Sequence, residues 1–408
     1  MRNSTYSGLV LEPHATDGSP SGVGAARDWL LRGFQDAAAG SERRMSVELQ
    51  TFIQPVSPRV PQPTPITNVV ATLRGTQAES ADRYYVVSGH YDSRCSDPLD
   101  AVCDAPGAND DASGVAAVLE LARVMAKREW DATIVFMAVA GEEQGLYGST
   151  YYAEQAKQRG LNIQGMLTND IVGSSLGGNG VRDPFTVRVF AQGAWPDETP
   201  EEAELRNSRG GENDSPPRQL ARFVKEQGQN RATGMRRVRI INRLDRFLRG
   251  GDHRPFIERR YPAVRFTEPN EDYRHQHQDV RVENGTVFGD LPEFVDFRYT
   301  TRVAKVNGAA LAGLASAPQA PSDVKIVATE LTYDTELEWA AGRQSDLAGY
   351  EVVWRETTAP DWTNSRRVGN TTRVTLENIS KDDFVFGIRA VDSDGNRSPV
   401  SFPTGIVE

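Results

Sequence analysis

Five side chains that bind metal ions well lie at the ends of segments predicted to be strands. In chain order they are His90, Asp110, Glu143, Asp170 and one histidine of the pair His275 and His277. Histidine nitrogens and carboxylate oxygens are ligands that zinc prefers, and a pair of zinc ions needs a mixed shell in which one carboxylate is shared. The chain has only five histidines, and four of them stand beside these acidic motifs. The pattern therefore predicts a site for two divalent cations.

The first motif places Asp92 two residues after His90. We expect the Asp92 carboxylate to hydrogen-bond the ring nitrogen of His90 that faces away from the metal, because such partners fix the tautomer of a metal-bound histidine. Taken alone, a His-x-Asp pattern is also typical of a solvated loop. Its meaning depends on the other motifs.

The second motif surrounds Asp110 with small residues, in the segment Gly107–Gly114. Small residues let the backbone turn sharply, so Asp110 can point inward with both oxygens free to bridge two metal ions. Capping of the following helix by Asp110 or Asp111 is the structural alternative. Capping alone, however, does not require small residues on both sides.

The third motif is the pair Glu142 and Glu143, which follows the predicted strand Thr133–Val139. Adjacent side chains point in different directions, so one glutamate can bind metal while its neighbour faces the metal-bound water. An acidic pair at a solvated helix end is the alternative. Asp170 repeats the arrangement of a carboxylate at a strand end. At the sheet edge where α/β proteins bind ligands, the functional interpretation is favoured.

These motifs need a scaffold of strands and helices, and the chain up to about residue 315 alternates the two. The predicted central strands are Val86–Ser88, Thr133–Val139, Met166–Thr168, Val187–Phe190 and Ala263–Phe266, and a helix is predicted over Ser113–Arg128. This alternation predicts an α/β fold with a mainly parallel mixed sheet and helices on both faces. Segment 196–218 is expected to be a long polar loop that shapes a binding site, followed by a helix over about 218–226.

The C-terminal part has a different pattern. A proline-bearing linker at 317–322 separates a domain at 1–316 from one at 323–408. Beyond the linker, short segments alternate apolar and polar residues with a period of two. They are Leu337–Trp339, Tyr350–Trp354, Arg373–Leu376 and Phe384–Asp392. Such spacing predicts an all-β sandwich.

Together these motifs resemble the secreted bacterial zinc leucyl aminopeptidases and their wider family of dizinc exopeptidases. The likeness spans most of 20–300 and rests on the His90, Asp110, Glu142–Glu143 and Asp170 motifs and on Asp252-His253. The resemblance implies that Asp110 bridges two zinc ions, with His90 and Asp170 on one and Glu143 and a late histidine on the other. It also implies Glu142 as general base and a cis peptide bond between Asp110 and Asp111.

The resemblance leaves the late histidine open. Matching from Asp272-Tyr273 favours His277, and counting back from Asp279 favours His275; we predict His277, with His275 as the alternative. His253 is implied to pack near the substrate pocket.

Family members often carry a tyrosine that steadies the developing oxyanion, just before the last histidine or shortly before the Asp-His segment. Gln276 and Leu248 stand at those places. Tyr273 or Arg249 is therefore expected to take the role.

The C-terminal domain resembles a fibronectin type III domain. The likeness rests on Trp339 in the second strand, Tyr350 opening the next, and the run 389–392 followed by Asp394-Gly395-Asn396. Such a domain is usually a spacer or adhesion module.

The expected function is that of a metalloaminopeptidase, which hydrolyses N-terminal residues from peptides or proteins by a zinc-bridged hydroxide. Two Zn²⁺ per chain are expected, with Mn²⁺ or Co²⁺ as possible substitutes. A carboxypeptidase of the same fold is the nearest alternative, because the metal shell does not specify which peptide end is bound. A non-catalytic, receptor-like ectodomain that binds proteins is a second. A glutaminyl-cyclase-like enzyme is disfavoured, because it would use a single zinc.

Charge and cysteines limit the partners and the compartment. The formal charge of −10 argues against nucleic acid, and no apolar run is long enough to cross a membrane. The start, 1–5, is polar and lacks the apolar core of a signal peptide. Cys95 and Cys103, the only cysteines, lie in one loop, and a disulfide is favoured over free thiols. We therefore expect export to a periplasmic or extracellular space, with any leader already removed.

Overall fold

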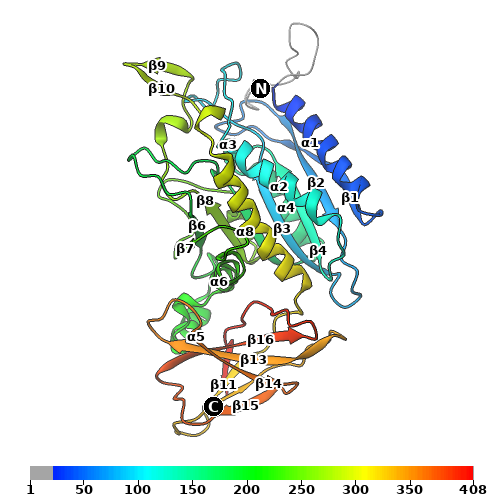
Figure 1. Cartoon of the computed structure of the whole chain (residues 1–408), viewed down its shortest axis with the longest axis vertical. Helices are drawn as coiled ribbons and strands as arrows, with labels where there is room; N and C mark the ends of the chain where they lie inside the picture. Colours follow the sequence, from blue (N-terminus) through cyan, green and yellow to red (C-terminus); the bar gives the residue numbers. More distant parts are fainter. Residues whose placement is uncertain (1–21, 408) are drawn as a thin grey trace.

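The computed structural model describes residues 22–407, so the polar N-terminal segment lies outside the described residues. An eight-stranded sheet with the order β1-β2-β4-β3-β5-β8-β6-β7 forms the larger part of the molecule, and two smaller sheets form the C-terminal part (Figure 1). None of the helices within 22–407 combines the length and apolar character that a membrane crossing needs.

The large sheet is mixed, with parallel pairing at its centre. Strand β3 pairs in parallel with β4 and β5, and β5 pairs in parallel with β8. The antiparallel pairs are β1 with β2, β2 with β4, and β6 with β8. The strands are β1 Met45–Gln54, β2 Thr64–Leu73, β3 Arg83–His90, β4 Thr133–Val139, β5 Asn162–Asn169, β6 Thr186–Ala191, β7 Arg237–Ile241 and β8 Ala263–Thr267.

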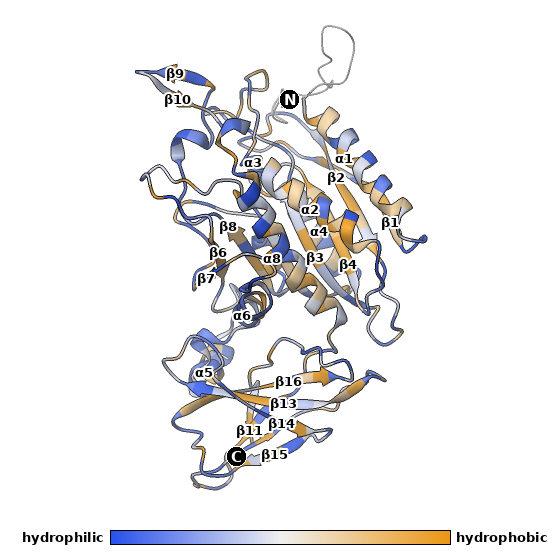
Figure 2. Cartoon of the chain, viewed as in Figure 1, coloured by the Kyte–Doolittle hydropathy of each residue, from blue (hydrophilic) through white to orange (hydrophobic). Residues whose placement is uncertain are grey.

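Helices cover both faces of this sheet. One face carries α1 Gly22–Ala39, α2 Ala112–Met125, α6 Pro216–Gly228 and α8 Phe297–Ser316, and the other carries α4 Tyr147–Gln158 and α7 Arg254–Ile257. Strand β4 is buried along its whole length: Ile134 and Phe136 belong to the core on the first face, and Val135 and Met137 to the core on the second. Figure 2 shows these central strands as predominantly hydrophobic. The α/β scaffold expected from the sequence is therefore present.

Short elements lie around the edge of the sheet that holds the carboxyl ends of the central strands. They are the helix α3 Glu142–Gly145, the 3-10 turns η2 Tyr273–His275 and η3 Pro292–Phe294, and the hairpin strands β9 Arg281–Glu283 and β10 Thr286–Phe288. In Figure 1 the β9–β10 hairpin lies at the end of the molecule opposite the C-terminal sheets.

The C-terminal part is a β-sandwich. One sheet has the strand order β15-β12-β11-β17 and the other β14-β13-β16. Trp339 and Tyr350 pack edge to face in its core, with ring centroids 5.3 Å apart. The strands are β11 Lys325–Val327, β12 Thr335–Glu338, β13 Leu347–Glu356, β14 Asn364–Gly369, β15 Arg373–Leu376, β16 Phe384–Asp392 and β17 Gly405–Val407.

The prediction of a binding-site loop over 196–218 is wrong. This segment contains helix α5 Pro200–Ser208 and the turn η1 Gly211–Asn213, and it contacts the sandwich. Arg209 donates a hydrogen bond to the main-chain oxygen of Pro403 at 2.8 Å. Helix α5 begins with a complete capping box between Thr199 and Glu202, which the proline-rich composition obscured.

A buried ion-pair network joins the two parts of the molecule. Asp214, which follows η1, lies 2.6 Å from Arg355 of β13 and 3.0 Å from Arg222 of α6. The side chains of Arg355 and Asp214 are 2% and 0% exposed. Nearby, Arg389 of β16 pairs with Glu226 at 3.0 Å. Separating these residues would leave buried charges without a partner, which costs free energy. We therefore expect the network to hold the sandwich in one position relative to the α/β domain.

We expect Arg355→Met to destabilise the protein by about 3 kcal/mol, because it leaves the buried Asp214 carboxylate short of one partner. Chemical denaturation measures the change in the free energy of unfolding. Arg366→Met is the matched control, since Arg366 is an exposed arginine of the same sandwich. Equal stability of the two variants would contradict a structural role for the network.

Candidate metal centre

The residues predicted to bind metal converge at one edge of the large sheet. His90 is the last residue of β3, Asp170 directly follows β5, and Glu142 and Glu143 open helix α3 just after β4. These three strands are parallel, so their carboxyl ends meet at the same edge. Side chains far apart in sequence are thereby brought within a few ångströms.

Two groups of candidate ligands lie at this edge. One contains His90, Glu142 and Asp170, and the other contains Asp110, Glu143 and His277; within each group the ligand atoms lie within 4.8 Å of one another. Asp110 reaches both groups, because its Oδ1 is 3.1 Å from His90 Nε2 and its Oδ2 is 3.0 Å from His277 Nε2. An aspartate between two histidines in this way has the geometry of a bridging ligand.

The structure separates the two candidate late histidines. Besides Asp110, His277 Nε2 lies 3.0 Å from Glu143 Oε2. His277 has a φ of 51°, a left-handed conformation that is costly for a residue with a side chain and that occurs often at functional sites. His275 instead stacks on Phe294, with ring centroids 3.5 Å apart, and does not reach the centre.

Asp110 is held from the backbone side by a residue that the sequence did not reveal. The carboxylate of Asp290 accepts hydrogen bonds from the N–H groups of Asn109 and Asp110, at 2.8 and 2.7 Å. The Asp110–Asp111 peptide bond is cis, as the family resemblance implied. The capping alternative applies to Asp111, which accepts from Gly114 N–H at 3.1 Å, and leaves Asp110 free to face the centre.

The predicted contact between Asp92 and His90 uses a different atom. His90 Nδ1 lies 3.0 Å from the main-chain oxygen of Asp92 and 3.7 Å from its carboxylate. That carboxylate instead accepts the N–H groups of Glu142 and Glu143, at 3.4 and 3.1 Å. The prediction of a carboxylate–histidine hydrogen bond is therefore wrong, although Asp92 still orients both His90 and the start of α3.

The centre holds more negative charge than its protein partners balance. Burial raises the pKa of Glu142 well above its usual value, and it also raises the pKa of Asp170. Burial alone would lower the pKa of His277, but Glu143 and Asp110 outweigh it and raise the value to about 9. Such a site favours added positive charge.

The donor atoms also fit a cation. Among the described residues, the buried His90 Nε2 and Glu143 Oε1 atoms have no hydrogen-bond partner. A buried polar atom without a partner is costly, and a coordinated metal ion would remove that cost. Imidazole and carboxylate donors in this arrangement suit zinc.

A cavity of about 260 Å³ lies beside the centre and is lined by Asp110, Glu142, Glu143, Asp170 and His277. Arg249 lines it as well, with Nη1 2.9 Å from His277 Nδ1. Tyr273 is exposed and lines a second, outer cavity of about 710 Å³. Of the two residues proposed for the oxyanion, Arg249 is therefore the nearer to the centre.

His253 does not reach the cavities. It is buried, its Nε2 lies 2.8 Å from the main-chain oxygen of Leu244, and it lines neither of the two cavities. Burial lowers the pKa of His253 to about 4, so this ring is neutral. His253 is therefore a packing residue, as the resemblance implied, and does not line either cavity.

Two arginines of the centre were not predicted. Arg265 of β8 is buried and lies 2.7 Å from Asp170 and 2.9 Å from Asp245. A charged residue inside the apolar run Ala263–Phe266 was the available signal. Arg94 lies 3.1 Å from Glu143 Oε2 and 2.7 Å from His277 Nδ1, and no sequence pattern marked it.

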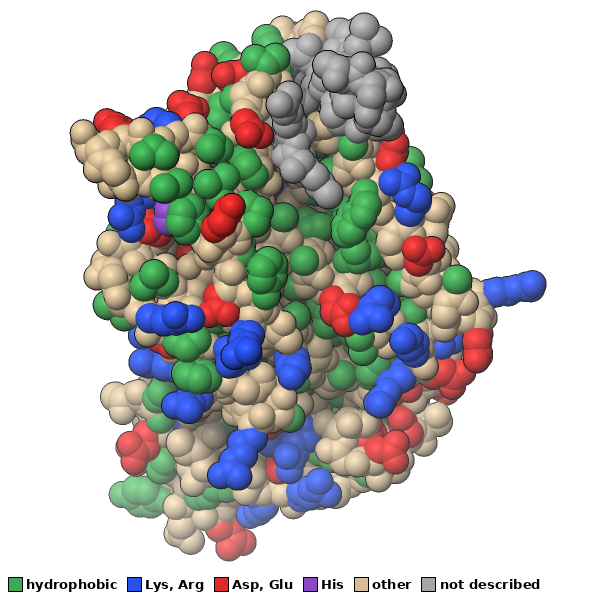
Figure 3. Space-filling model, turned by 45° about the horizontal axis from the view of Figure 1, so that its top comes forward, with side chains coloured by type: hydrophobic (Ala, Val, Ile, Leu, Met, Phe, Trp, Pro, Cys, Tyr) green, Lys and Arg blue, Asp and Glu red, His purple; other side chains and the backbone are tan. Residues whose placement is uncertain are grey.

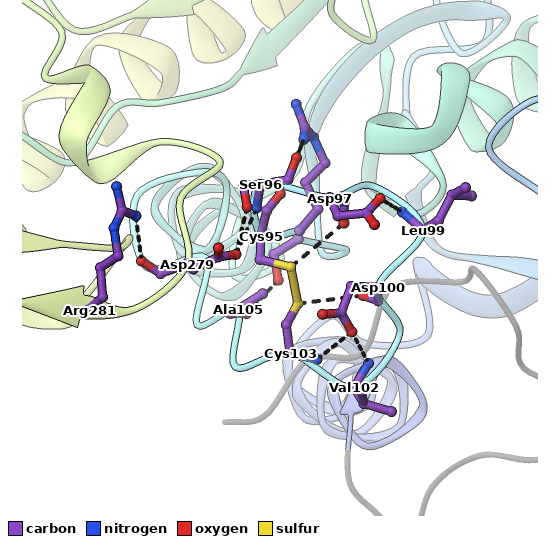
Figure 4. Close-up of a disulfide and its surroundings, with 12 residues drawn as sticks. Cys95, Ser96, Asp97, Leu99, Asp100, Val102, Cys103, Ala105, Asp279 and Arg281 are labelled. Atoms are coloured by element: carbon purple, nitrogen blue, oxygen red, sulfur yellow. Dashed lines mark hydrogen bonds between the residues drawn. A yellow bond between two sulfur atoms is a disulfide. The ribbon is translucent and has the colours of Figure 1, made fainter.

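The loop that carries Arg94 is fixed by a disulfide. Cys95 and Cys103 are bonded, as predicted from their place in one loop (Figure 4). Ser96 donates its N–H and hydroxyl to Asp279 Oδ1, at 3.2 and 2.8 Å. This loop is thereby tied to the segment that carries His277.

Comparison with known proteins adds independent information. The model of Peptidase family M28 matches residues 68–284. A protein of Leptosphaeria maculans described as a probable zinc metalloprotease is 55% identical over 94% of this chain and 88% of its own length. A Pyricularia oryzae protein with the same description is 53% identical over 94% of this chain and 76% of its own length. Both are fungal, whereas the resemblance in sequence was to bacterial enzymes.

Among solved structures, an aminopeptidase from Aneurinibacillus sp. strain AM-1 is 25% identical to this chain. It has a TM-score of 0.42, and the match covers 62% of this chain and 49% of that one.

The two histidines of the late segment provide a matched pair for testing the centre. We expect His277→Ala to lower the amount of zinc bound per chain, because it removes a ligand atom from one of the two groups. His275→Ala should leave the zinc content unchanged, since His275 packs on Phe294. Metal analysis of the purified variants measures both. Normal zinc in the first variant, or loss in the second, would contradict the assignment.

Proposed function

Because this chain belongs to Peptidase family M28, we propose that it is a zinc-dependent exopeptidase, and specifically an aminopeptidase that removes N-terminal residues from peptides. The observation that carries the proposal is the position of Asp110 between His90 and His277. A carboxylate with one oxygen directed to each histidine is suited to hold two cations close together.

The proposed ligands follow from the two groups. His90 and Asp170 would hold one zinc ion, Glu143 and His277 the other, and Asp110 both. When bound, zinc polarises a peptide carbonyl and lowers the pKa of water.

Glu142 is proposed as the general base. It lines the cavity, is partly exposed there, and its carboxylate accepts no hydrogen bond from another described residue. Each of the other carboxylates in the two groups lies within 3.1 Å of a histidine or arginine. The Glu142 carboxylate is therefore free to take a proton from the attacking water and to pass it to the leaving amine.

A carboxypeptidase is the second candidate, and one observation favours it. Arg249 lines the cavity and has no carboxylate partner among the described residues. A guanidinium in that state would suit the terminal carboxylate of a peptide. The amine of a peptide would instead need an acidic group, and Glu271, which lines the outer cavity, already pairs with Arg188 and Arg246.

The remaining proposals concern organisation and place of action. We propose that 323–408 is a fibronectin type III-like spacer, since its two sheets and its Trp339–Tyr350 packing suit that fold. We also propose export from the cytoplasm, because the Cys95–Cys103 disulfide suits an oxidising compartment.

We expect Glu142→Gln to lower kcat by roughly 10²- to 10⁴-fold with little loss of bound zinc, because the amide keeps the shape but cannot take up a proton. Aminoacyl-nitroanilide hydrolysis and metal analysis measure the two effects. Glu129→Gln, at an exposed position away from the cavity, is the control. Full activity of the Glu142 variant would exclude its role as base, and an inactive wild type would favour a non-catalytic, receptor-like protein.

A blocked ten-residue peptide distinguishes the two kinds of exopeptidase. For an aminopeptidase, acetylation of the N-terminus should abolish cleavage and amidation of the distant C-terminus should be tolerated. The opposite result would show a carboxypeptidase. Mass spectrometry of the products identifies the residue released, and cleavage of the doubly blocked peptide would exclude both forms of exopeptidase.

A further inference from the structure

The cavities beside the metal centre are unusually rich in arginine. The inner and outer cavities are adjacent, because they share the lining residues Arg94, Arg246, Leu248, Arg249 and His277. Together they are lined by Arg59, Arg94, Arg188, Arg243, Arg246, Arg249 and Arg265. The chain as a whole carries a formal charge of −10, and Lys and Arg side chains occur together with Asp and Glu across the face shown in Figure 3. The two cavities are also lined by five carboxylates, so the seven arginines exceed the acidic groups by two; the acidic residues are Asp110, Glu142, Glu143, Asp170 and Glu271.

Some of these arginines neutralise buried carboxylates. Arg188 and Arg246 both pair with Glu271, each at 2.5 Å. Arg265 pairs with Asp170 and Asp245. These contacts account for three guanidinium groups as parts of the fold.

Three others have no carboxylate partner among the described residues. Arg59 donates to the main-chain oxygen of Glu143 at 2.8 Å, and Arg243 stacks on the Phe247 ring at 3.6 Å. Arg249 contacts His277 Nδ1 and, at 3.5 Å, the side-chain oxygen of Gln276. Their charges face the cleft without compensation.

Arg94 and Arg249 converge on a single atom. Their terminal nitrogens lie 2.7 and 2.9 Å from His277 Nδ1. Arg94 is also held by Glu143 Oε2 at 3.1 Å and by the main-chain oxygens of Cys95 and Ser96. Arg249 has no such carboxylate among the described residues, so its guanidinium is the one best placed to pair with an anion in the cleft.

We propose that this arginine-lined cleft binds a carboxylate of the substrate, held mainly by Arg249 together with Arg94; the proposal rests on the exopeptidase function above. Guanidinium groups bind carboxylates through paired, charge-assisted hydrogen bonds. The carboxylate comes either from an acidic side chain next to the scissile bond or from the C-terminus of a short peptide. Arg249 is thereby assigned to substrate recognition and not to the oxyanion.

Binding to the zinc-loaded Glu142→Gln protein, measured by calorimetry, tests this assignment without relying on turnover. The probes are Ala-Ala-Ala-amide, Ala-Ala-Ala with a free C-terminus, Glu-Ala-Ala-amide and Ala-Glu-Ala-amide. At least one carboxylate-bearing peptide should bind roughly tenfold or more tightly than the neutral amide, as a charge-assisted pair predicts. The peptide that gains affinity identifies the terminal or the side-chain source. Equal affinity for all four peptides would overturn the proposal.

A second variant set separates recognition from a structural effect. Arg249→Ala, added to the Glu142→Gln background, should remove the preference for the carboxylate and leave the affinity for the neutral amide nearly unchanged, while Arg249→Lys should retain part of it. Arg123→Ala is the control, because Arg123 is an exposed arginine of α2 that pairs with Glu120. An equal loss for all peptides in Arg249→Ala would assign Arg249 to the fold and contradict the proposal.

The same measurements keep the two proposals apart. A carboxylate preference in the Glu142→Gln protein, combined with a wild type that cleaves none of the four peptides or the ten-residue peptide, would retain the recognition site and reject the exopeptidase. Cleavage of all peptides at equal kcat/KM, with no preference in binding, would retain the exopeptidase and reject the recognition site.

Discussion

The organisation of this molecule depends on a group of carboxylates that are crowded together away from water. Asp110, Glu143 and Asp170 are buried at one sheet edge, and desolvation works against their charge. Histidines and arginines supply part of the compensation, and the zinc ions proposed for this centre would supply the rest. The surrounding hydrogen bonds serve this arrangement: Asp290 fixes the turn before α2, and Asp92 fixes the start of α3. The same carboxylates therefore affect both the stability of the fold and the proposed binding of metal.

The sequence predicted the part of the site that follows from strand ends. His90, Glu143 and Asp170 were predicted because parallel strands bring their carboxyl ends together, and each strand end can be recognised from a short stretch of sequence. His277 was distinguished from His275 only by family spacing. Asp290 and Arg94 were not predictable, because their roles come from loops that meet across the fold. The same limit explains why the prediction of a loop near the site over 196–218 is wrong: the partner of this segment, the sandwich, lies more than a hundred residues later in the chain.

The arginines that line the cleft fall into two groups with different physical roles. The arginines paired with Glu271, Asp170 and Asp245 neutralise buried carboxylates, so their removal would destabilise the fold. Arg59, Arg243 and Arg249 differ in kind, because among the described residues their partners are a main-chain oxygen, an aromatic ring, and the side chains of His277 and Gln276. Arginines that line the same cavities thus have two physical roles. Only the placement of the acidic partners separates them.

The Arg355–Asp214 pair has a consequence for how the enzyme meets its surroundings. A short linker alone would allow the sandwich to rotate relative to the α/β domain, but a buried charge pair between the two resists their separation. Figure 1 places the β9–β10 hairpin, beside the segment of His277, at the far end from the sandwich. A surface held by the sandwich would therefore stay at a fixed distance from the hairpin end of the molecule.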